Sequence, residues 1–168
     1  MIHSVMIFNQ LGKPRLLKFY TELDTATQQA LFRDIYGVIS KRPDNLCKFV
    51  DGGQSAMVGS GNRIIYRRYA TLFFVFVVDQ SESELGIYDL IQVFVEALDR
   101  AFENVSELDV IFNFDQVHYI LSEIVTAGMV SEVNLTEISR AVNEAKKLAK
   151  PPNEAGRLGL GSFRRGFS

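Results

Sequence analysis

Apolar and polar residues follow two different periods along the chain, and these periods separate its strands from its helices. Ile2 to Phe8 is apolar, and Arg15 to Tyr20 resumes an extended pattern after the turn-rich interval Asn9–Lys13. Two such runs joined by a short turn predict an N-terminal β-hairpin. Pro14 falls at the start of the second strand, where a missing N–H group disrupts pairing least.

The longest apolar run, from Tyr69 to Val78, predicts a central strand. Alternation places two sets of apolar side chains on its two faces: Tyr69, Phe73, Val75 and Val77 on one, and Ala70, Leu72, Phe74, Phe76 and Val78 on the other. Because both faces are apolar, helices should cover the sheet on both sides. Leu46–Val50 and Arg63–Arg68 are predicted as further strands, joined by a Gly-rich connection over residues 51–62.

Apolar residues at helical spacing predict two long helices. The first lies near residues 25–40, is opened by the capping-box spacing of Thr25–Gln28, and is ended by the Arg42-Pro43 turn. The second is opened by the similar spacing of Ser81–Glu84. Its inner stripe is predicted to hold Leu85, Tyr88, Ile91, Phe94, Val95, Leu98 and Phe102.

Shorter helices follow. They are expected near Glu107–Phe112, near Asp115–Ala127 with Gly128 as the C-cap, and after the cap Asn134 with the stripe Ile138, Ala141, Val142, Ala145 and Leu148. This order predicts an α+β domain over residues 1–150 with an antiparallel sheet. Residues 151–168 are rich in Gly and Arg with few core formers, and are predicted to be a flexible tail.

Composition narrows the class of protein. The 168 residues carry a net charge of −2, which provides no general attraction for nucleic acid or anionic lipid. The single cysteine, Cys47, excludes an intramolecular disulfide and is expected to be a buried thiol in a reducing compartment. No apolar run approaches the ~18 residues that span a bilayer. With no basic leader at the N-terminus, a soluble intracellular protein is expected.

The sequence contains few residues in patterns that would support catalysis or cofactor binding. His3 and His118 lie in different predicted elements without ligand neighbours, so no metal site is expected. The Gly-rich interval 52–61 joins two strands and lacks the lysine of a phosphate-binding loop. We therefore expect no enzyme and no cofactor. A small enzyme or nucleotide-binding domain would need a site that the sequence does not offer.

Three arginines stand out. Arg67 and Arg68 adjoin the apolar run, and alternation sends them to opposite faces; Arg15 begins the second strand. They suit either an ordinary solvated strand end or capture of a peptide that is both acidic and apolar. For Arg67 and Arg68, the pattern leaves open contact with a partner chain, a peptide or a lipid.

Four stretches carry a resemblance to a known family. They are Asn9–Leu16, Ile65–Phe74, Phe94–Leu98 and Phe102–Asp109. They resemble the sigma (small) subunits of clathrin-adaptor-type heterotetrameric complexes, in unbroken order over roughly residues 1–148. The loop at 51–62 and the segments 79–87 and 89–93 look most like the sigma chain of adaptor complex three.

The resemblance implies a longin-like (SNARE-like) fold, with a five-stranded antiparallel sheet between helices. It also implies assembly with two large subunits and one medium subunit into a cytosolic coat at endosomal or trans-Golgi membranes, and recognition of acidic dileucine tails of membrane cargo. Residue by residue, it places two leucine pockets at Ala70, Leu72, Val95, Val105 and Val110. Asn104 would meet the peptide backbone and Arg15 the upstream acid. Pro14, just before Arg15, departs from the family pattern.

Two alternatives stay open at this point. The five apolar residues also suit plain core packing. The chain could also be a longin-type coat or tethering subunit that only scaffolds assembly.

Overall fold

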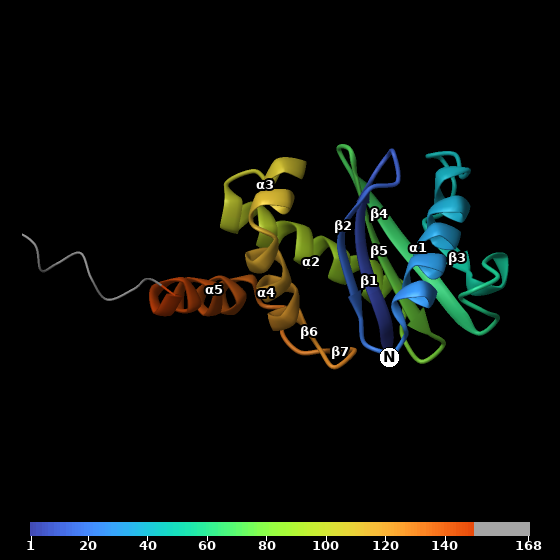
Figure 1. The fold of residues 1–168 in the computed structure, drawn as a ribbon. Coiled ribbons are helices and arrows are strands. Elements are labelled where there is room, and N and C mark those ends of the chain that lie inside the picture. The colour runs from blue at the N-terminus through green and yellow to red at the C-terminus, as the bar shows by residue number, and fades with distance from the viewer. Residues whose placement is uncertain (150–168) are drawn as a thin grey trace, which may run out of the picture.

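Five strands form one antiparallel sheet in a computed structural model that describes residues 1–149. The sheet order is β2-β1-β5-β4-β3. The strands are β1 (Ile2–Asn9), β2 (Pro14–Phe19), β3 (Phe49–Asp51), β4 (Asn62–Tyr69) and β5 (Leu72–Asp79). Figure 1 shows α1 on one side of the sheet and the other helices on the opposite side. The predicted α+β fold, a five-stranded sheet covered on both faces, is confirmed.

Five α-helices complete the fold within the described residues. They are α1 (Thr25–Ser40), α2 (Glu84–Phe102), α3 (Glu107–Phe112), α4 (Phe114–Ile124) and α5 (Leu135–Ala149), with a short 3-10 helix at Gly52–Gln54 and a small hairpin of β6 (Val125–Thr126) and β7 (Met129–Val130). Within residues 1–149, none of these helices combines the length and apolar character needed to cross a membrane. The tail predicted for residues 151–168 lies outside the described residues.

β5 is central, as its two apolar faces predicted. It pairs with β1 on one edge and β4 on the other. Val75 and Val77 pack into the core that α1 covers. The opposite face packs against α2, where the rings of Phe74 and Phe94 meet edge to face with centroids 5.8 Å apart. The strand is therefore buried on both faces.

One prediction for this region is wrong. The run from Tyr69 to Asp79 is not a single strand, because β4 ends at Tyr69 and the chain turns at Ala70 and Thr71 before β5. Tyr69 pairs with Leu72 and packs on the α2 side, 5.9 Å from the Phe74 ring, so it does not share a face with Phe73. The alternation rule counts positions along one strand and fails across a turn.

Two helix starts also differ from the prediction. The N-cap of α1 is Asp24, and that of α2 is Ser83, whose hydroxyl accepts a hydrogen bond from the Gly86 amide. The capping box predicted for α1 therefore begins one residue after the true N-cap, and the box predicted for α2 begins two residues before it. Leu85, predicted on the inner stripe of α2, is 68% exposed in its first turn.

Two single-residue predictions fail for related reasons. Gly128 does not cap α4, because the helix ends at Ile124 and Gly128 lies in the β6–β7 turn with φ +77°. Its carbonyl accepts a hydrogen bond of 2.8 Å from the Ile2 amide. Cys47 is exposed, because it lies in the loop between α1 and β3 and not in a strand.

Candidate functional site

Arg15 and Ala70, two of the predicted site residues, lie at one end of the sheet. The β1–β2 and β4–β5 turns both lie at this end in Figure 1. Glu107, the first residue of α3, joins the two turns through side-chain bonds to Arg15 and Thr71. Segments far apart in sequence therefore meet around one carboxylate.

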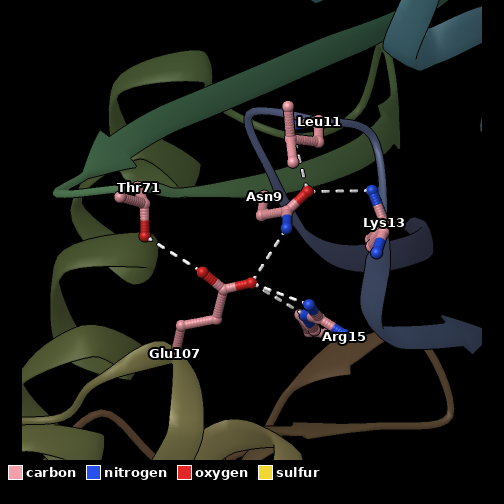
Figure 2. A network of polar contacts seen from close by, with 6 residues as sticks. All are labelled: Asn9, Leu11, Lys13, Arg15, Thr71 and Glu107. Carbon is pink, nitrogen blue, oxygen red and sulfur yellow. Dashed lines mark hydrogen bonds and ion pairs between the residues drawn. The ribbon is translucent and has the colours of Figure 1, made fainter.

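Figure 2 shows how Glu107 is held. Its Oε1 accepts hydrogen bonds from Arg15 Nη2 at 2.9 Å, Arg15 Nε at 3.0 Å and Asn9 Nδ2 at 2.9 Å. Its Oε2 accepts a longer bond of 3.3 Å from Thr71 Oγ1. The bond from Asn9, followed by those from Arg15 and Thr71, lowers the pKa of the Glu107 carboxyl. The carboxyl is therefore ionised at neutral pH.

Asn9 is itself fixed by the turn that it opens. Its Oδ1 accepts hydrogen bonds from the amides of Leu11 at 3.0 Å and Lys13 at 2.9 Å, both visible in Figure 2. An Asn side chain that bonds its own following backbone stabilises a turn and leaves its amide nitrogen directed elsewhere. Here that nitrogen bonds Glu107, so the hairpin turn helps to position the carboxylate.

Arg15 faces this internal acid in the structure. The pair is about three-quarters buried, with 22% of the Arg15 side chain and 26% of the Glu107 side chain exposed. The resemblance placed an acid from a cargo peptide at Arg15, and that role stays a prediction. A peptide acid arriving there would meet a guanidinium whose charge is already balanced.

The five apolar residues of the predicted leucine pockets divide into two groups. Leu72, Val95 and Val110 are 4%, 2% and 0% exposed and share one core, against which the half-buried Val105 packs. Ala70 is exposed in the β4–β5 turn. Four of the five side chains therefore belong to or pack on the same core, and their role as peptide pockets stays a prediction.

Backbone strain marks two of the surface positions. Ala70 has φ +51°, and Asn104, which follows α2, has φ +77° next to Glu103 at +53°. Left-handed backbone in residues other than Gly costs about 1–3 kcal/mol and recurs at binding sites. Within residues 1–149 the Asn104 side chain makes no hydrogen bond. Its exposed amide is therefore available to a peptide backbone.

Arg67 and Arg68 point to opposite faces of the sheet, as alternation predicted. The Arg67 guanidinium lies 4.2 Å from the ring centroid of Tyr88 on α2, whereas Arg68 lies 5.7 Å from the ring of Phe73 on the α1 side. Arg68 Nη1 also forms an ion pair of 2.9 Å with Asp44.

Sequence reasoning missed Glu107 and Asn9 as members of the site. In the sequence, Glu107 marks only the start of a predicted helix. In the structure the capping box of α3 is formed by Ser106 and Asp109, which leaves the Glu107 side chain to reach Arg15. Glu107 lies 92 positions after Arg15 and 98 positions after Asn9 in the sequence. No local sequence pattern could reveal contacts over such separations.

A five-stranded antiparallel sheet with helices on both faces is the longin-like fold of an adaptor small chain, and the comparisons agree with this class. Residues 1–149 match the family described as clathrin adaptor complex small chain, and the chain belongs to that family. Over 153 residues it is 56% identical to the AP-3 complex subunit sigma of Schizosaccharomyces pombe, covering 91% of each chain.

Other relatives have related names. Human AP-3 complex subunit sigma-2 is 53% identical over 150 residues, which cover 89% of this chain and 77% of that protein. The AP-3 complex subunit sigma of Arabidopsis thaliana is 46% identical over 153 residues, or 91% of each chain. A chain in a homology model of the full-length AP-3 complex in a stretched open conformation superimposes with a TM-score of 0.70 at 44% identity, covering 89% of this chain and 95% of that chain.

Proposed function

We propose that this chain is the small subunit of an AP-3-type adaptor complex in vesicle-mediated protein transport, and that it helps to recognise acidic dileucine signals in membrane cargo. The identity of 46–56% to AP-3 sigma subunits over about nine-tenths of the chain supports the first part. In this role it assembles with two large subunits and one medium subunit, and reaches endosomal or trans-Golgi membranes as part of the complex.

One observation carries the second part: four aliphatic side chains belong to or pack on one core, and two exposed, left-handed residues lie close to two of them in sequence. Leu72, Val95, Val105 and Val110 belong to or pack on one core, while Ala70 and Asn104 lie at the surface. A small side chain at Ala70 leaves room above the core, and each leucine buried there contributes about 1.5–3 kcal/mol before ordering costs.

A second candidate function is scaffolding without cargo binding. The burial of Leu72, Val95 and Val110 to 4% exposure or less favours it, because peptide leucines enter only if these side chains move apart. Peptide titration of the assembled complex separates the two candidates. Binding that requires both leucines supports cargo recognition, and no binding at all supports scaffolding.

Ala70→Trp is the variant that tests the site. The turn is exposed, so the bulky ring should block the surface above the core without unfolding the chain. We expect dileucine peptide affinity to fall at least tenfold, measured by calorimetric titration of the complex. Ala30→Trp, the same change at an exposed position of α1 on the other side of the sheet, should leave affinity unchanged. Equal affinities in both variants would contradict the pocket assignment.

A further inference from the structure

A second charged surface borders the β4–β5 turn. It is an open cavity of about 460 Å³, lined by Lys48, Arg67, Arg68, Tyr69, Ala70 and Tyr88, with Asp44 at its edge. Three cationic side chains against one carboxylate leave the cavity positive. Ala70 belongs both to this cavity and to the proposed peptide site, so the two surfaces are continuous.

The three cations are not equally engaged. Arg68 is paired with Asp44 at 2.9 Å and donates to the Ala70 carbonyl at 3.2 Å. The Lys48 ammonium donates to the Asp44 carbonyl at 2.8 Å and lies 5.3 Å from the Tyr66 ring centroid. Among the described residues, only the charge of Arg68 is therefore matched by a carboxylate.

Arg67 is held differently. Within residues 1–149 it forms no ion pair, and its guanidinium lies 4.2 Å from the Tyr88 ring centroid and 5.5 Å from that of Tyr69. Aromatic rings that pack against a guanidinium restrict its motion before any ligand binds. Less side-chain entropy is therefore lost when the guanidinium binds a carboxylate. Arg67 is thus prepared for an anion, whereas Arg15 is already paired with Glu107.

The separation of the two arginines determines what can reach both. Arg15 lies on β2 and Arg67 on β4, with β1 and β5 between them. Three strand spacings amount to about 14 Å, which one acidic side chain does not span. An extended peptide covers that distance in about four or five residues. The six residues from an upstream acid to the position after the leucine pair reach at most about 20 Å, which is more than enough.

We infer that Arg67, supported by Lys48, binds a second acidic residue of the same cargo peptide, placed just after its leucine pair. This inference rests on the proposed function. A peptide whose upstream acid lies near Arg15 and whose leucines lie at Ala70 reaches the cavity with the residues that follow. Continuity with Ala70 favours a peptide acid over a membrane lipid as the occupant, and the positive charge of the cavity suits the carboxylate of that acid.

The test uses the assembled complex and two peptides that share one Glu-x-x-x-Leu-Leu core. One peptide has Ala after the leucines and the other has Glu. We expect the added Glu to tighten binding about three- to tenfold at low ionic strength, and less at high salt. Arg67→Gln should abolish this gain. Arg33→Gln, the same loss of charge at an exposed position of α1 on the other side of the sheet, is the matched control and should retain the gain. Co-elution of all subunits verifies that both variants assemble.

Each outcome has one meaning. A core peptide that binds without any gain from the added Glu, or a gain that survives Arg67→Gln, overturns the inference and leaves the proposed function standing. A core peptide that fails to bind overturns the proposed function and, with it, the inference. If Arg67→Gln weakens binding to phosphatidylserine vesicles and leaves both peptides unaffected, the cavity is a membrane contact and the inference is wrong.

Discussion

Glu107 links three segments of the site through a single side chain, and its charge state should be visible in stability. Its pKa is lowered from the ordinary value near 4.5, mainly by the bond from Asn9 and then by Arg15. A carboxyl with a lowered pKa stabilises the fold above the pKa of the unfolded chain, and this contribution disappears as pH falls through the folded value.

Glu107→Gln should therefore lower the free energy of unfolding at pH 7 by about 0.2–1 kcal/mol, the usual range for a partly exposed ion pair. The difference from the wild type should shrink below about pH 4.5, as the wild-type carboxyl also becomes protonated. Urea unfolding of the wild type and of Glu107→Gln between pH 7 and pH values below about 4.5 measures this difference in the free energy of unfolding. Glu103→Gln, an equal change of charge at an exposed position just after α2, is the control for the loss of one carboxylate. A difference that stays constant with pH would contradict the assignment.

At the scale of elements, one glycine in the β6–β7 hairpin allows this hairpin to pack closely against the start of β1. Gly128 has φ +77°, and a Cβ atom placed there would lie 2.6 Å from the Ile2 carbonyl oxygen. The same residue accepts the hydrogen bond from the Ile2 amide. Both the backbone conformation and the close approach to β1 therefore require the absence of a side chain.

Gly128→Ala should cost about 1–3 kcal/mol, because it adds left-handed strain and forces the turn away from β1. Ala127→Gly is the matched change one residue earlier, where alanine already has φ +51°. There the relief of strain and the greater entropy of the unfolded chain oppose each other, so stability should change by less than about 1 kcal/mol. Chemical denaturation of both variants measures their free energies of unfolding. Equal losses in the two variants would argue against the close approach of Gly128 to the Ile2 carbonyl oxygen.

Periodicity predicted most elements because their signals are local. The N-terminal hairpin, α1, α3 and α5 begin and end near their expected residues. The β4–β5 turn was missed because Ala70-Thr71 contains no Gly, Pro or Asn, and apolar residues flank this pair on both sides. The Arg15–Glu107 pair was missed because it depends on how α3 packs beside β2, which no sequence window contains.

At the scale of the whole molecule, the sheet separates two cores that share β5. The larger one lies under α2 and α4, and the smaller one lies under α1. Phe74 anchors the larger core with 1% of its surface exposed. By contrast, Phe112 on α3 is 80% exposed. The same amino acid therefore occurs in two opposite environments in this chain.

Phe74→Ala should lower the free energy of unfolding by about 3–5 kcal/mol, because it leaves a cavity among aromatic rings. Phe112→Ala should change it by less than about 0.5 kcal/mol. Thermal unfolding of the two purified variants, monitored by circular dichroism, provides the comparison. A small loss for Phe74→Ala would mean that the core beneath α2 repacks freely.

The central position of β5 also has a consequence for dynamics. Both of its edges are paired and both of its faces are buried, so its amide protons reach solvent only when the whole sheet opens. In heavy water these amides should be the last in the chain to take up deuterium. Their rate therefore reports global opening, and faster labelling at the neighbouring turn of Ala70 would report local motion where cargo is proposed to bind.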